Sequence, residues 1–159
     1  MIFVAVGTQK FSFNRLLKNI DDLIEAGAIT EEVFAQIGNS DYIPKNFKYI
    51  SFMSKEDFDS TVERSSLVIT HSGVGTIISA ISRHKPIIVC PRLSKYGEHV
   101  DDHQLEIAQY FSKMKYILMC NDGEALLDVI NIARDYEFAE YKSQKAKAVE
   151  TIRTYLKSL

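Results

Sequence analysis

Short apolar runs alternate with segments of helical periodicity along this chain. The runs are short and rich in β-branched side chains, which is typical of strands buried on both faces of a parallel sheet. This alternation predicts an α/β fold with a single Rossmann-like, doubly wound and mainly parallel sheet. The expected strands are residues 2–6, 33–37, 49–52, 67–70, 86–90 and 116–119.

Amphipathic segments lie between and after these runs. From Phe13 onward apolar residues recur every 3.6 positions, and Gly27 follows as the residue expected to end that helix. Ser54, with Asp57 three residues later, predicts the start of a helix that runs to about residue 64. The remaining expected helices are 77–81, 105–111, one capped by Asn121 or Asp122, and a charged amphipathic helix over about 140–156.

Length and composition indicate one globular domain over residues 1–159, because 46% of the residues are hydrophobic and 25% are charged. A net charge of -2 gives no general attraction to nucleic acid, so no nucleic-acid partner is expected. No apolar run approaches the roughly 18 to 20 residues that span a bilayer, and the opening residues do not form a signal peptide. Cys90 and Cys120 show no Cys-x-x-Cys spacing, which favours a reducing, cytoplasmic compartment.

A glycine-containing loop follows the apolar run 67–70. Its Gly73 and Gly75 precede a helix, and free amides at a helix N-terminus favour an anion such as a phosphate. His71 and Ser72 add side-chain donors beside them. A purely structural role, with the glycines serving a turn and His71 a satisfied core residue, stays open here. The loop is neither a Walker loop, since no Gly-Lys-Ser/Thr follows, nor a complete dinucleotide fingerprint, since the third glycine is missing.

A polar cluster occupies residues 98–104, with two histidines, three acids and a glutamine in seven positions. Such donors and acceptors suit a polyhydroxyl ligand such as a sugar. A solvated helix start is the alternative. A metal site at His99 and His103 is a weaker one, because the pair lacks a His-Glu-x-x-His pattern and a third ligand. No metal is therefore expected.

Three motifs follow one another in a fixed order: Thr-His-Ser-Gly-Val-Gly-Thr-Ile at 70–77, Lys-Pro-Ile-Ile-Val-Cys-Pro-Arg at 85–92, and Glu-His-Val-Asp-Asp-His-Gln-Leu-Glu-Ile-Ala at 98–108. In this order they resemble the C-terminal, donor-binding domain of the GT-B glycosyltransferases of family 28. The resemblance covers nearly the whole chain. A complete GT-B enzyme has two Rossmann-like domains, and this chain has room for one. The resemblance therefore implies the stand-alone catalytic half of a two-component enzyme, as in the dolichol-linked GlcNAc transferase and the paired bacterial exopolysaccharide and capsule transferases.

The resemblance also implies a reaction, namely inverting transfer of a hexose from a UDP-sugar to a lipid-diphosphate-linked saccharide in exopolysaccharide or capsule synthesis. The expected partner is a membrane-associated, acceptor-binding subunit, which would hold this cytoplasmic chain at the inner face of the membrane. The helix over 140–156 either covers the sheet or docks that subunit or an anionic lipid surface. No cofactor is implied beyond the UDP-sugar donor. A non-catalytic nucleotide-sugar-binding scaffold, a sugar-nucleotide epimerase and an NAD-binding domain stay open as alternatives.

Carried over by position, the resemblance implies a set of site residues. Larger relatives often have a glutamate in the helix after the glycine loop, which binds the ribose hydroxyls, where this chain has Ser79. The catalytic candidates are His71, Asp102 and His103, with His99 as a further possible base and the partner as an alternative source of it. The expected nucleotide-sugar ligands are Gly7, Thr8, Phe52, Met53, His71, Ser72, Gly73, Gly75, Thr76, Arg92, Glu98 and Gln104.

Overall fold

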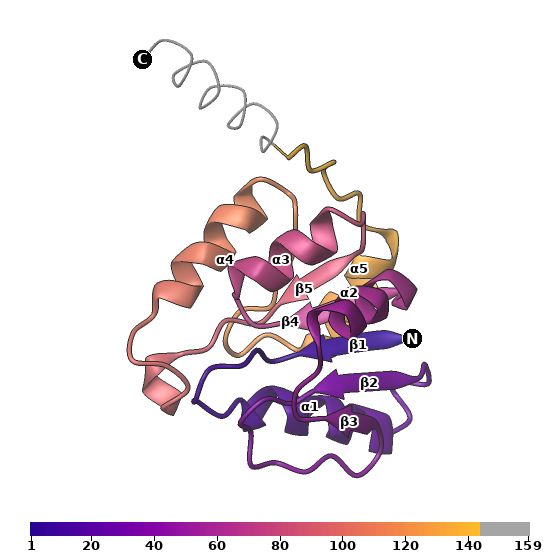
Figure 1. The fold of residues 1–159 in the computed structure, drawn as a ribbon, viewed down its shortest axis with the longest axis vertical. Helices are drawn as coiled ribbons and strands as arrows, with labels where there is room; N and C mark the ends of the chain where they lie inside the picture. The colour runs from indigo at the N-terminus through magenta and orange to yellow at the C-terminus, as the bar shows by residue number, and fades with distance from the viewer. Residues whose placement is uncertain (144–159) are drawn as a thin grey trace.

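The computed structural model describes residues 1–143. Within them six strands form one sheet in the order β3-β2-β1-β4-β5-β6, and every pairing is parallel (Figure 1). The predicted doubly wound α/β fold with β1 at its centre is confirmed. The strands are β1 (Ile2–Ala5), β2 (Val33–Gln36), β3 (Lys48–Ile50), β4 (Leu67–Thr70), β5 (Ile87–Val89) and β6 (Leu118–Met119).

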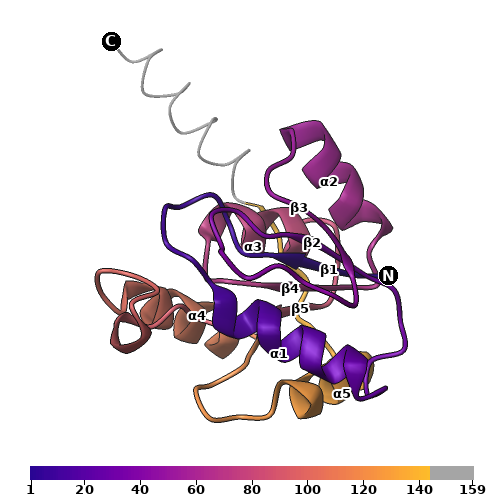
Figure 2. The ribbon, with the colours of Figure 1, turned by 90° about the horizontal axis from the view of Figure 1, so that it is seen from below.

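Helices cover both faces of the sheet. Figure 2 shows α1 and α5 on one side of it and α2 and α3 on the other. Alternate residues of β1 explain this arrangement, because Ile2 and Val4 face the core beside α1 and α5, whereas Phe3 and Ala5 face the core beside α2, α3 and α4. The helices are α1 (Asn14–Glu25), α2 (Lys55–Arg64), α3 (Val74–Ile81), α4 (His103–Lys113) and α5 (Leu126–Asp135).

Most expected element positions are confirmed to within a few residues. Ser54 caps α2 by accepting a hydrogen bond of 3.1 Å from the Asp57 amide, as its spacing predicted. The third strand was placed too late: it is 48–50, and all three of its residues are exposed at the edge of the sheet. With little of its side-chain surface buried, this strand left only a weak apolar signal.

The start of α5 corrects a predicted cap. Ala125 is its N-cap residue, not Asn121 or Asp122. The Asn121 amide and side chain both bond the Glu124 carboxylate, at 2.9 and 3.1 Å, so this segment closes a turn before the helix begins. Of the helix predicted over 140–156, residues 140–143 are not helical, and the remainder lies outside the described residues.

No helix in residues 1–143 has the length and apolar content to cross a membrane.

A buried carboxylate fixes the loop that follows β2. Asp21 of α1 is only 2% exposed and accepts hydrogen bonds from the Tyr42 hydroxyl (2.7 Å) and from the amides of Lys45 (2.9 Å) and Asn46 (2.8 Å). Burial by itself raises the pKa of Asp21, but these hydrogen bonds outweigh it and hold the pKa below its ordinary value. The carboxylate therefore stays charged and ties the loop to α1.

We expect Asp21→Ala to lower the free energy of unfolding by about 2–3 kcal/mol, because it leaves two loop amides and the Tyr42 hydroxyl without their acceptor. Urea-induced unfolding measures the change. The neighbouring Asp22→Ala is the matched control and should cost less than about 0.5 kcal/mol, since Asp22 makes only an exposed ion pair with Lys18. Equal losses for the two variants would contradict this role of Asp21.

Candidate functional site

A cavity of about 530 Å³ opens at the carboxyl ends of β1, β2 and β4. Strand β1 pairs with β2 on one side and with β4 on the other. The strands that follow β1 are added first on the β2 side and then, from β4 onward, on the opposite side, so the strand order reverses here. Open α/β sheets bind ligands at such a switch point. The cavity is lined by Gly7, Thr8, Gln9, Gln36, Met53, Ser54, Lys55, Phe58, Asp59, His71, Gly73, Gly75, Thr76 and Ser79.

The structure brings together about half of the residues expected from the sequence. Those that line the cavity are Gly7, Thr8, Met53, His71, Gly73, Gly75 and Thr76. The α2 residues Lys55, Phe58 and Asp59 were missed as site residues, because nothing in the sequence shows that α2 packs against α3. The expected residues that do not line it are Phe52, Ser72, Arg92, Glu98, Asp102, His103 and Gln104.

The N-terminus of α3 forms one wall of this cavity. Its N-cap residue is Gly73, whose lack of a side chain leaves the end uncapped, and its first turn contains no acidic residue. The amides of the first turn have no carbonyl one turn earlier to bond, and the helix dipole adds partial positive charge there. Gly75 and Thr76 carry this end of the helix into the cavity. The arrangement suits an anion such as a phosphate.

The ring of His71 packs between two glycines at the floor of the cavity. A Cβ atom on Gly73 would lie 2.4 Å from Nε2 of His71, and one on Gly7 would lie 2.6 Å from it. Gly7 also has a φ of +82°, which side-chain-bearing residues rarely adopt. The two glycines are therefore required by the position of the imidazole as well as by the turns.

Hydrogen bonds define the tautomer of His71. Its Nδ1 lies 3.3 Å from the Ala5 carbonyl oxygen, which can only accept, so Nδ1 carries the proton and Nε2 carries a lone pair. Burial, together with the nearby charge of Arg92, lowers the pKa of His71 to about 4. A neutral ring with an unprotonated Nε2 accepts hydrogen bonds there and does not donate them. The α3 amides, the Thr76 hydroxyl and the Lys55 ammonium are among the donors that remain around the cavity.

Arg92 and Glu98 hold together the loops at the carboxyl ends of the strands and do not face the cavity. Arg92 is 1% exposed, and its guanidinium donates to the carbonyl oxygens of Val6 (2.6 Å) and Phe11 (2.7 Å). Glu98 is buried in a two-pronged ion pair with Arg15, with both N–O distances 2.9 Å. Both side chains are thus engaged within the protein and do not line the cavity.

The polar side chains of residues 98–104 do not form one site, because their hydrogen bonds hold them in different places. Gln104 is buried and accepts from the Arg92 amide at 3.2 Å, and Asp102 accepts from the Ser94 amide at 2.9 Å. Asp102 lines a different cavity, of about 420 Å³. His103 is exposed beside Glu106. None of these side chains reaches the glycine-loop cavity in this structure.

Two further expected residues lie outside the cavity. The hydroxyl of Ser72 is buried and has no hydrogen-bond partner among the residues that the structure describes. Phe52 projects from the surface with about half of it exposed. The described part of the chain also contains no group of three or more His, Cys, Asp or Glu side chains placed to hold a metal ion.

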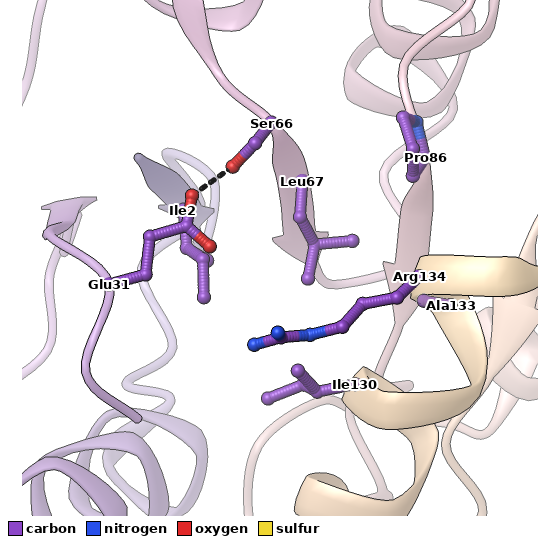
Figure 3. A pocket seen from close by; sticks show the side chains of 8 residues that line it. All are labelled: Ile2, Glu31, Ser66, Leu67, Pro86, Ile130, Ala133 and Arg134. Carbon is purple, nitrogen blue, oxygen red and sulfur yellow. Dashed lines mark hydrogen bonds between the residues drawn. The ribbon is translucent and has the colours of Figure 1, made fainter. Parts of the chain in front are cut away.

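A smaller cavity of about 250 Å³ lies at the opposite ends of the strands, where β1 and β4 begin (Figure 3). Figure 3 shows Glu31 hydrogen-bonded to Ser66, with the Arg134 guanidinium extended across the cavity above Ile130. This cavity lies among the amino ends of the strands and the last turns of α5. It lacks the helix N-terminus and the glycines of the other cavity, which is therefore the candidate site.

The sequence also matches a known family. The model of the glycosyltransferase family 28 C-terminal domain matches residues 1–158. The UDP-N-acetylglucosamine transferase subunit ALG13 of Saccharomyces cerevisiae is 35% identical over 78 residues, which are 48% of this chain and 37% of that protein. The chain spans less than half the length of the curated relatives that it matches, between 10% and 43%.

Solved structures show the same fold. An NMR solution structure of ALG13 superposes with a TM-score of 0.58 at 18% identity, covering 95% of this chain and 93% of that one. The crystal structure of CalG4, the calicheamicin glycosyltransferase, superposes with a TM-score of 0.59 at 15% identity, covering 84% of this chain and 34% of that one. At these identities the likeness concerns the fold alone.

We expect Gly73→Ala to lower the free energy of unfolding by about 1–3 kcal/mol, because the new methyl group would overlap the buried His71 ring. Gly75→Ala is the control. A Cβ there meets nothing within 4 Å, so this variant should be as stable as the wild type or slightly more so. Urea-induced unfolding of both variants measures the difference, and a Gly73→Ala protein of wild-type stability would contradict the packing described above.

The free energy of unfolding should also decrease as the pH is lowered, because of His71. The unfolded chain binds a proton on this histidine near pH 6.5, whereas the folded protein binds it only near pH 4. Acidification from pH 6.5 toward 4 therefore favours unfolding, by at most about 3 kcal/mol. Urea-induced unfolding between pH 6.5 and 4.5 should show this slope in the wild type and in the control His103→Asn, but a much weaker slope in His71→Asn. An NMR titration midpoint near 6.5 for the His71 ring would refute it.

Proposed function

The chain belongs to the glycosyltransferase family 28 C-terminal domain family, and we propose that it is the donor-binding, catalytic half of a two-component glycosyltransferase. The proposed reaction is inverting transfer of a sugar from a UDP-sugar to a lipid-diphosphate-linked saccharide. One observation carries the proposal, namely the uncapped N-terminus of α3 in a cavity at the switch point of the sheet. This is where an α/β sheet holds a nucleotide diphosphate.

The cavity suits both ends of a nucleotide. Gly73, Gly75 and Thr76 would hold the diphosphate at the N-terminus of α3, where the space beside Gly75 is open. Met53 and Phe58 are partly buried and give the same cavity an apolar wall on which a base can pack. A nucleoside diphosphate thus matches the polarity of the site along its length.

The same backbone groups supply the chemistry. As the glycosidic bond breaks, the leaving UDP gains negative charge, and amides already directed at the phosphates stabilise that charge without rearranging. The relatives that match in sequence are named UDP-N-acetylglucosamine transferase subunits, so UDP-N-acetylglucosamine is our proposed donor. The exopolysaccharide or capsule setting expected from the sequence has no support from these names, and the acceptor is proposed only as a lipid-linked saccharide.

A second half should complete the active site. Among the residues that line the cavity, only Lys55, Asp59 and His71 titrate. The hydrogen bond from Lys55 holds the pKa of Asp59 below its ordinary value, and the pKa of His71 is about 4, so both groups are weak bases at pH 7. We therefore propose that the general base comes from a membrane-associated partner subunit that also binds the acceptor. The chain would then work at the cytosolic face of the membrane through that partner.

Calorimetry on the purified chain tests donor binding. We expect UDP to bind and NAD not to bind. Gly75→Val should lower the affinity for UDP at least tenfold, because its side chain fills the space proposed for the diphosphate. Its free energy of unfolding should stay within about 1 kcal/mol of the wild type. Ser82→Val, at the exposed end of the same helix, is the matched control and should bind UDP normally. Binding of NAD without UDP would instead support an NAD-binding domain.

Turnover separates a catalyst from a scaffold. The chain is co-expressed with its membrane subunit, and transfer from radiolabelled UDP-N-acetylglucosamine to lipid is measured on membranes. Gly75→Val should abolish transfer while still binding the subunit. Wild-type transfer by this variant would show that the chain is a non-catalytic scaffold.

A further inference from the structure

A carboxylate on α2 faces α3 across the candidate site. Oδ1 of Asp59 accepts a hydrogen bond of 3.0 Å from the Ser79 hydroxyl and lies 3.3 Å from Nη2 of Arg83. Its Oδ2 lies 2.6 Å from Nζ of Lys55. Both Asp59 and Ser79 line the glycine-loop cavity. A carboxylate of α2 therefore stands beside Ser79 of α3 at the wall of this cavity.

This carboxylate is charged and open to a ligand. The hydrogen bond from Lys55 holds the pKa of Asp59 below its ordinary value despite some burial, so the group is ionised at pH 7. Its side chain is 25% exposed, and that of Lys55 is 81% exposed, so the contact between them exchanges readily with solvent or with a ligand. A carboxylate has four acceptor positions, and the three protein donors leave one unused.

The position of Asp59 matches the sugar of a bound nucleotide. Ser79 follows Thr76 by three residues, so the two lie on the same face of α3, about 4.5 Å apart along its axis. A diphosphate bound at the N-terminus of α3 would leave room for the ribose roughly one turn further along, in the cavity between Ser79 and α2. Phe58, next to Asp59 on α2, belongs to the apolar wall proposed for the base.

We propose that Asp59, oriented by Ser79, recognises the ribose by accepting a hydrogen bond from its 2′-hydroxyl, and thereby makes the site selective for ribonucleotides over deoxyribonucleotides. An ionised acceptor gives a stronger hydrogen bond than a neutral one, and Rossmann-type domains use an acidic residue for this task. Here the acid comes from α2. The inference rests on the proposed function, because it takes the ligand to be a nucleoside diphosphate.

Calorimetric titrations with UDP and with 2′-deoxy-UDP test this assignment. The wild type should bind UDP about tenfold more tightly than 2′-deoxy-UDP. In Asp59→Asn the affinity for UDP should fall about tenfold while that for 2′-deoxy-UDP changes less than about twofold, so the preference disappears. Glu63→Gln is the matched control. It removes the same charge from the same helix beside Arg83, 3.6 Å away, but it lies outside the cavity and should keep the preference.

A second variant tests the position of the charge. Adding Ser79→Glu to Asp59→Asn moves the carboxylate from α2 to α3 and should restore a preference for UDP. A full preference in Asp59→Asn, with normal UDP binding, would overturn the role of Asp59 and leave the proposed function standing. Failure of the folded wild type to bind either nucleotide would overturn the proposed function and this inference with it.

Discussion

The buried guanidinium of Arg92 holds together the loops at the carboxyl ends of the strands. Through four carbonyl oxygens it joins the end of β1, the loop of residues 7–12 and the loop that follows β5. That first loop carries Gly7, Thr8 and Gln9 to the cavity, so the shape of the site depends on this side chain. Its positive charge also helps to keep His71 neutral. A single buried cation thus organises the loops and influences the protonation of the site.

The backbone supplies much of the positive character of the candidate site. His71 is neutral and Arg92 is engaged with carbonyl oxygens, so the exposed ammonium of Lys55 and the amide dipoles in the first turn of α3 are left to meet an anion. Such fixed dipoles do not titrate near pH 7 and need no reorganisation as charge develops on a leaving group. The proposed reaction also needs a general base, and His71, with a pKa of about 4, is a weak one at pH 7. The proposed partner subunit would supply that group.

The sequence located the glycine loop correctly but not the groups that surround it. Gly73 and Gly75 are local signals, because a turn and a helix start are decided by neighbouring residues. The cluster at 98–104 looked equally promising, yet Gln104 and Asp102 bond to the 92–94 segment and turn away from the cavity. Asp59 gave no signal, because its importance arises only where α2 meets Ser79 of α3. Contacts between distant elements leave no spacing pattern in a chain.

The order of strands and helices, the parallel sheet and the glycine loop followed from the sequence by itself, since apolar periodicity and glycine placement express local preferences. The tertiary structure alone decided which polar side chains line the glycine-loop cavity. It buried Arg92 and Glu98 in ion pairs and carbonyl contacts, and it fixed the tautomer of His71 through the Ala5 carbonyl oxygen. His71 and Ala5 are 66 positions apart in the sequence, and Arg92 and Val6 are 86 positions apart. Only the packing of the sheet brings such residues within hydrogen-bond distance.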